Sequence, residues 1–159
     1  MMFTDLIWIP AFILLLYAPF ACYWDLKHRE IPTGFWTLLW TICIPVTILL
    51  YAVQVYPIEG IIVSGFCIGF YLIAGLRGVF SGADFWYLTG ISVFLVTNPV
   101  SGHSLMAATY LIFLVVSVIG FALLYQTKIL NKYLGDDSKP GFPFMLQISF
   151  ALLLTVVLG

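Results

Sequence analysis

Apolar residues fill most of this chain in six runs, separated by short breaks that carry the polar residues, glycines and prolines. A membrane-spanning helix needs roughly 20 mostly apolar residues. The runs therefore predict an all-α membrane protein, a polytopic bundle of six transmembrane helices. The expected helices cover residues 5–24, 33–53, 59–76, 84–97, 104–125 and 143–158.

The breaks between these runs are short, apart from residues 126–142, QTKILNKYLGDDSKPGF, which we expect to form a loop within one transmembrane domain covering residues 1–159. Hydrophobic residues make up 63% of the chain and charged residues 8%, whereas a soluble domain carries about 25% charged residues. This composition excludes a water-soluble protein, and a net charge of −1 gives no sign of a nucleic-acid partner. The N-terminal residues lack the positive charges of a secretory signal, so the first run should remain as a helix.

Basic residues are confined to alternate connections of the predicted bundle. All of them follow the first, third or fifth run: Lys27, Arg29, Arg77, Lys128, Lys132 and Lys139. Cytoplasmic loops of membrane proteins carry the excess of Lys and Arg. We therefore expect a multi-pass plasma-membrane protein with both termini outside and the 126–142 loop in the cytoplasm. Asp25 and Asp84 then lie on the cytoplasmic side.

Two further residue types were considered for function. Cys22, Cys43 and Cys67 all fall inside apolar runs and form no Cys-x-x-Cys pair, so neither a metal site nor a redox motif is expected, and no cofactor is predicted. Gly65 and Gly69, together with a nearby serine, form a small-residue face that predicts close helix packing.

The fourth predicted helix is short for a membrane span. Its fourteen residues would extend about 21 Å, whereas the hydrocarbon core is about 30 Å thick. The preceding segment GVFSGA, residues 78–83, would then dip below the membrane surface. Non-helical backbone at that depth must be buried in protein or line water. Gly78 and Gly82 suit such a loop because glycine tolerates unusual dihedral angles, and the pattern predicts a wet pocket that opens to the cytoplasm.

Asp25 and Asp84 admit both a structural and a functional interpretation. Asp84 could cap the positive end of its helix, and Asp25 could pair with Lys27 and Arg29 at the surface. However, ionisable groups at membrane depth usually mark function. Two neighbouring carboxylates share one proton, so that one can activate a water and the other can protonate the product of its attack on a peptide bond. This is the chemistry of an aspartyl protease.

The residues around the two aspartates resemble the active-site motifs of a known family. DLKHREIP and SGAD are similar to the motifs of type IV prepilin peptidases and archaeal preflagellin peptidases, which are GxGD intramembrane aspartyl proteases. The resemblance implies that Asp25 and Asp84 are catalytic. It assigns supporting positions to Arg29, Ile31, Pro32, Gly82 and Ala83. Ala83 replaces the second glycine of a strict Gly-x-Gly-Asp motif. The chain resembles the short, peptidase-only form of the family, so we expect no methylation activity.

The resemblance also implies a substrate, namely a pilin-like or flagellin-like precursor with a short basic leader before a hydrophobic helix. Cleavage would occur at the cytoplasmic face, with the apolar helix docked beside the first and fourth helices and surrounded by lipid. Glu30, Asp136 and Asp137 are candidates to hold the basic leader, although they could simply be solvated. Pro140 and Pro143 resemble a proline-containing segment near GxGD active sites, but they also suit an ordinary junction between loop and helix.

Two other functions fit the same aspartates. A small proton-coupled transporter or proton-relay subunit would use them to pass protons, and a non-catalytic pilus-assembly protein would use them only as helix caps. A relay usually places acids in both halves of a pathway. Because Asp25 and Asp84 are predicted on one side, the pattern favours the peptidase.

Overall fold

The computed structural model describes residues 4–28, 31–53, 55–78, 82–98, 105–126 and 144–159. A short 3-10 helix, η1 (Thr4–Ile7), is followed by six α-helices and, within these ranges, by no β-strand. The α-helices are α1 (Trp8–His28), α2 (Thr33–Ala52), α3 (Ile58–Leu76), α4 (Gly82–Phe94), α5 (Met106–Gln126) and α7 (Met145–Leu158). The prediction of an all-helical fold is confirmed.

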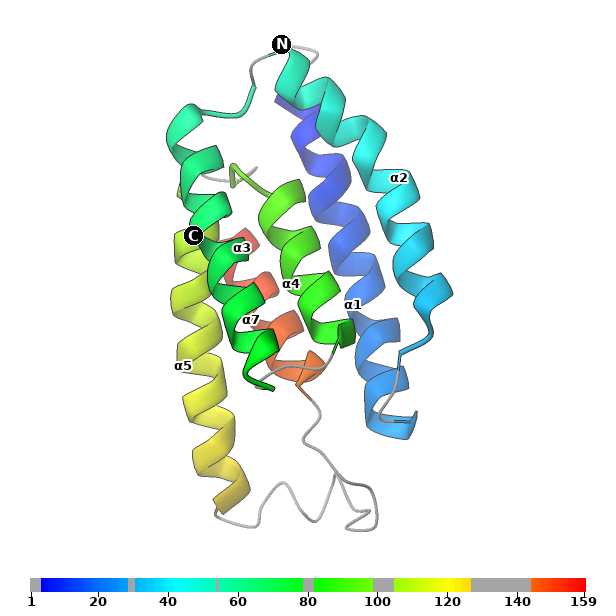
Figure 1. The fold of residues 1–159 in the computed structure, drawn as a ribbon, viewed down its shortest axis with the longest axis vertical. Helices are drawn as coiled ribbons and strands as arrows, with labels where there is room; N and C mark the ends of the chain where they lie inside the picture. Colours follow the sequence, from blue (N-terminus) through cyan, green and yellow to red (C-terminus); the bar gives the residue numbers. More distant parts are fainter. Residues whose placement is uncertain (1–3, 29–30, 54, 79–81, 99–104, 127–143) are drawn as a thin grey trace.

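The helices form a bundle in which consecutive members run in opposite directions (Figure 1). The short helix α4 packs against α1, α2, α3 and α7, and most of its residues are buried. At its far end, the Tyr56 hydroxyl donates a hydrogen bond of 2.8 Å to the carbonyl of Phe94, the last residue of α4. Helix carbonyls at a C-terminus lack intrahelical partners, so this bond fixes where α4 ends.

The outer surface of the bundle is apolar. In α1, α2 and α3, only 28%, 28% and 22% of the most apolar stretch is buried within the chain. Large hydrophobic side chains such as Phe66 and Leu76 are 77% and 80% exposed. An apolar exterior of this extent suits lipid rather than water. These three helices are long and apolar enough to cross a membrane, whereas the apolar segments Met106–Gly120 and Met145–Leu158 are shorter.

Each helix differs from its predicted bounds by a few residues, and two of these differences move a carboxylate. Helix α1 continues to His28, so Asp25 lies inside its last turns rather than at its end. The basic residues Lys27 and His28 close this helix and suit the negative end of its dipole. Helix α4 covers Gly82–Phe94 rather than 84–97, which makes Asp84 its third residue.

The glycines only partly behave as predicted. Gly78 has a φ of +74°, a left-handed conformation that favours glycine, whereas Gly82 is helical and has open space where a Cβ would stand. The expectation of unusual dihedral angles is therefore wrong for Gly82, because the helix begins there. Residues 79–81 of the predicted loop lie outside the described ranges.

The expected small-residue packing on α3 is wrong for Gly65 and Gly69, whereas the nearby Ser64 is buried. Gly65 and Gly69 have no heavy atom within 4 Å of an added Cβ, and both line an open surface groove on α3 rather than a helix–helix contact.

Candidate active site at the basic end of the bundle

Asp25 joins α1 to the beginning of α7. Its Oδ2 accepts a hydrogen bond of 3.1 Å from the backbone N–H of Met145, the first residue of α7. Phe144, which precedes α7, makes no side-chain capping bond. The first N–H groups of a helix have no partner within that helix, and here a carboxylate from a distant helix satisfies one of them. Asp25 thus orients α7, and Met145 in turn orients the carboxylate.

Asp84 lies in the first turn of α4 and is 8% exposed. The positive end of the helix dipole stabilises a negative charge at this position. Tyr110 of α5 is fully buried. The Tyr110 hydroxyl donates a hydrogen bond of 3.4 Å to the carbonyl of Ile148 in the first turn of α7. Helix α4, which carries Asp84, also packs against α7, whose beginning Asp25 holds.

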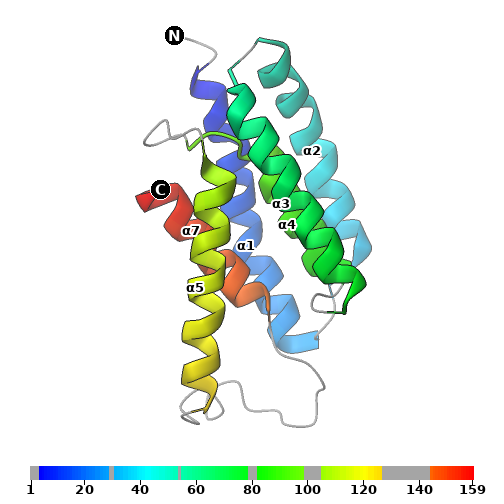
Figure 2. The ribbon, with the colours of Figure 1, turned by 60° about the vertical axis from the view of Figure 1, so that its left-hand side comes forward.

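The two aspartates lie at one end of the bundle. Helix α1 ends, and helices α4 and α7 begin, towards the lower end in Figure 1, and the rotated view in Figure 2 agrees. Lys27, in the last turn of α1, and Arg77, which follows α3, belong to this same end. The chain thus brings two acids from remote segments to its basic end.

Tyr87 fixes the helix of Asp84 against the helix of Asp25. It is fully buried one turn after Asp84, and its hydroxyl donates a hydrogen bond of 3.0 Å to the carbonyl of Leu14 in α1. Its ring lies 5.1 Å from that of Trp36 in α2. The sequence analysis missed this residue. The available signal was a tyrosine inside an apolar helix, because a buried tyrosine hydroxyl usually needs a partner.

The other predicted site residues are spread more widely. Ile31 and Ala83 are half-buried and pack against the main hydrophobic core, and Pro32 precedes α2, where its carbonyl accepts the N–H of Phe35 at 3.0 Å. Gly82 begins α4. The remaining candidates lie outside the described residues: Arg29, Glu30, Asp136, Asp137, Pro140, Pro143 and, except for Gln126, the 126–142 loop. Within the described ranges, no three His, Cys, Asp or Glu side chains lie close enough to hold a metal ion.

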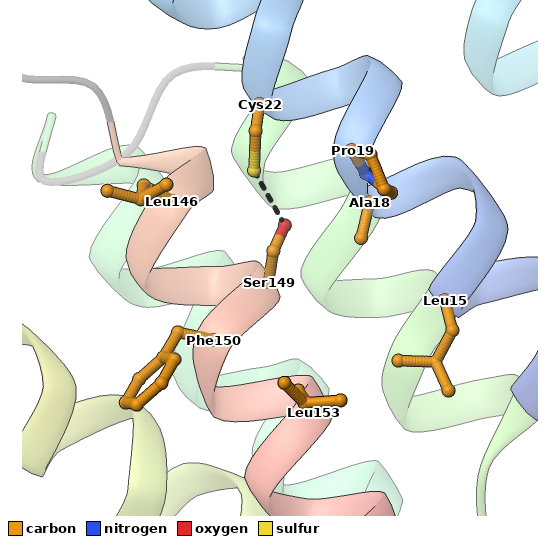
Figure 3. Close-up of a pocket in the computed structure, with 8 residues that line it drawn as sticks. All are labelled: Leu15, Ala18, Pro19, Cys22, Leu146, Ser149, Phe150 and Leu153. Atoms are coloured by element: carbon orange, nitrogen blue, oxygen red, sulfur yellow. Dashed lines mark hydrogen bonds between the residues drawn. The ribbon is translucent and has the colours of Figure 1, made fainter.

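A groove of about 440 Å³ lies between α1 and α7 (Figure 3). Its α1 side comprises Leu15, Ala18, Pro19 and Cys22, and its α7 side comprises Leu146, Ser149, Phe150 and Leu153. The Cys22 thiol lies 3.2 Å from the Ser149 hydroxyl and 3.4 Å from the Met145 carbonyl, and its single S–H can donate to either oxygen. Cys22 is therefore a polar contact in the groove, although it falls inside an apolar run of the sequence.

Comparison of the chain with protein-family models, with curated proteins and with solved structures gives no match. The resemblance to the prepilin and preflagellin peptidases therefore depends on the two short motifs and on the geometry that the chain gives to their aspartates.

Proposed function

We propose that this protein is an intramembrane aspartyl endopeptidase that removes the short basic leader of type IV pilin-like or archaeal flagellin-like precursors at the cytoplasmic membrane face. One observation carries the proposal. Asp25 and Asp84, which are remote in sequence, lie at the same end of the bundle, where Asp25 binds the first N–H of α7 and the helix of Asp84 packs against α7.

The chemistry needs only two carboxyl groups and a water. One carboxylate takes a proton from the water, whose oxygen forms a bond to the carbonyl carbon of the scissile peptide. The other carboxyl group donates its proton to the reacting amide. Collapse of the tetrahedral intermediate then breaks the C–N bond and releases a carboxylate and an amine. Because two close carboxylates share one proton, the pair can supply the base and the acid together.

The surroundings of the aspartates suit this role. The Met145 N–H binds one oxygen of Asp25 and so orients its carboxylate at the beginning of α7. Asp84 is nearly buried, and the Tyr87 bond to Leu14 holds its helix in place. Preorganised groups in a water-poor site stabilise developing charge better than the same groups in bulk water. In this proposal Arg29, Ile31, Pro32 and Ala83 shape the segments beside the two acids.

The basic end of the bundle is the cytoplasmic end in this proposal. Lys27 and Arg77 lie there, and the positive-inside rule assigns such residues to the cytoplasm. All six helices then cross the plasma membrane and both termini lie outside. A basic leader would approach from the cytoplasm, while the apolar helix that follows it would remain in the lipid.

Co-expression with a precursor that carries a basic leader and an apolar helix tests the proposal. Asp25→Asn and Asp84→Asn should each abolish leader removal while the protein still inserts into membranes. Glu59→Gln is a matched control, because Glu59 is an exposed acid in the first turn of α3, at the opposite end of the bundle. It should leave cleavage unchanged. Leader removal by either aspartate variant at normal expression would rule out the two-aspartate mechanism.

A proton-relay subunit is the second candidate, and buried hydroxyls inside the bundle favour it. The Oγ atoms of Ser64 on α3 and Thr89 on α4 are buried, and neither has a hydrogen-bond partner among the described residues. Such groups suit a hydrated path that continues from Asp84. Proton flux into liposomes that contain the purified protein separates the two functions: the relay requires a flux that Asp84→Asn abolishes, and the peptidase predicts none.

A further inference from the structure

We propose that the groove between α1 and α7 receives the apolar segment of the substrate on the membrane side of the scissile bond. This inference rests on the proposed peptidase function and adds where the substrate lies. It also differs from the expectation that the substrate helix docks beside α1 and α4. Three features support this inference: the position of the groove, the backbone carbonyl that Pro19 leaves without its helical hydrogen bond, and the opening of the groove to the lipid.

The groove leads to a candidate catalytic residue. Along α1 it extends from Leu15 to Cys22, a length of about 10 Å at 1.5 Å per residue. Asp25 lies one turn beyond Cys22 on the same helix. On the α7 side the groove begins at Leu146, directly after the residue whose N–H binds Asp25. A chain that lies in this groove therefore reaches the Asp25 carboxylate at one end.

Pro19 leaves a backbone acceptor without its helical bond in this apolar surface. Proline has no N–H, so it cannot donate to the carbonyl of Leu15, four residues earlier in α1. Leu15 and Pro19 both line the groove. A polar backbone group in hydrocarbon costs free energy unless a partner satisfies it. A lipid acyl chain has no hydrogen-bond donor, whereas a peptide offers backbone N–H groups or Ser and Thr hydroxyls. The groove is therefore better suited to a polypeptide than to lipid.

The size and the rim of the groove agree with a peptide segment that enters sideways. A volume of about 440 Å³ falls within the range of about 300–1,000 Å³ that is typical of binding pockets, and it suits a few side chains rather than a whole helix. Phe150 and Leu153 on the rim are 46% and 47% exposed, and Pro19 is exposed as well. The apolar side chains of a substrate helix can thus enter from the lipid.

A second groove on α3 provides a comparison within the same chain. It has a volume of about 520 Å³ and is lined by Ile62, Gly65, Phe66, Gly69, Phe70 and Ile73. It contains no proline, so no backbone bond is missing there, and none of its lining residues is acidic. This groove has the same apolar character without the features that favour a peptide, and it serves as the control site.

Disulfide cross-linking to the native Cys22 tests the docking directly. The probe is a synthetic peptide with a basic leader and a 20-residue Leu/Ala helix that carries one cysteine at successive positions. It is mixed in phosphatidylcholine vesicles with the Asp84→Asn variant, and copper phenanthroline oxidises neighbouring thiols to a disulfide. Cys43 and Cys67 are 0% and 4% exposed, and Cys22→Ser shows any background.

We expect adducts in the first three turns of the probe helix, with maxima every three or four positions, because one helix face enters the groove. Absence of adducts, or equal adducts at every position, would overturn the docking inference and leave the groove to lipid. Because this readout measures contact without turnover, it decides the inference even if no cleavage is found in the wild-type protein.

Cleavage kinetics provide a second test. Pro19→Leu supplies the missing N–H and adds a larger side chain at an exposed position, so the helix should still form. It should raise KM for the helix-bearing precursor about tenfold, the effect of one lost hydrogen bond, without affecting a short leader peptide that lacks the helix. Gly69→Phe in the α3 groove should change neither. An unchanged KM in Pro19→Leu would contradict the docking inference, whereas cleavage by Asp25→Asn would contradict the peptidase itself.

Discussion

Asp25 has two roles here that substitution can separate, because it caps α7 and is also a proposed catalytic acid. Asp25→Asn keeps an oxygen that can accept the Met145 N–H, but it removes the charge. Asp25→Ala removes the acceptor as well. A hydrogen bond to a charged group contributes about 1.5–3 kcal/mol and one between neutral groups about 0.5–1.5 kcal/mol. The asparagine variant should therefore lose about 1 kcal/mol of stability, and the alanine variant about 2 kcal/mol.

These losses are measurable as changes in thermal unfolding. For a domain of this size, 1 kcal/mol corresponds to about 2–4 °C in Tm. We expect the Tm of Asp25→Asn to fall by about 3 °C and that of Asp25→Ala by about 6 °C, followed by tryptophan fluorescence in detergent. Leader removal should fall by at least about 10³-fold in both variants, because each lacks an acid–base group. The two variants should thus lose activity to a similar extent but differ in the loss of Tm.

The Asp84→Asn variant is the matched comparison, because it removes the second carboxyl group without touching the bond between Asp25 and Met145. It should lose activity to the same extent. If Asp25→Asn keeps more than a tenth of the wild-type activity, Asp25 is only a helix cap and the proposed mechanism is wrong. If Asp25→Ala is as stable as the wild type, the bond to Met145 does not hold α7 in place.

Three further outcomes follow from the contacts described above. Tyr87→Phe removes the hydroxyl that is bonded to the Leu14 carbonyl. It should cost about 1 kcal/mol of stability and lower kcat for leader removal. An unchanged kcat would show that Tyr87 does not position Asp84. Burial raises the pKa of Tyr56, so the folded state keeps this hydroxyl protonated while the unfolded chain ionises it above about pH 10. Stability should therefore fall as the pH rises above 10, and Tyr56→Phe should make unfolding midpoints between pH 9 and 11 depend less on pH; an equal slope in both proteins would contradict this. Gly78→Ala should destabilise the fold by about 1–2 kcal/mol because of its left-handed φ, and Gly78→Asn by less; equal midpoints in thermal unfolding would show that this turn can change conformation freely.

The sequence predicted the parts of this protein that depend on local composition. Six α-helices were expected, and six are described. A helix pairs the backbone N–H and C=O groups of an apolar segment within that segment, so its formation does not depend on which neighbours it contacts. The unusual conformation at Gly78 was anticipated for the same local reason. The errors in the helix boundaries are also local in scale: the extra turn of α1 and the shift of α4 depend on which residues close or open a helix.

The arrangement of the candidate site was decided only by the tertiary structure. The partner of Asp25 lies 120 positions away in sequence, and the carbonyl that binds Tyr87 lies 73 positions away. Likewise, the proline at position 19 was visible from the start, but the groove that it lines depends on α7. Hydropathy acts along the chain and determines which segments become helices. Which side chains meet depends on how those helices pack, and apolar runs of similar length and composition carry little information about their neighbours.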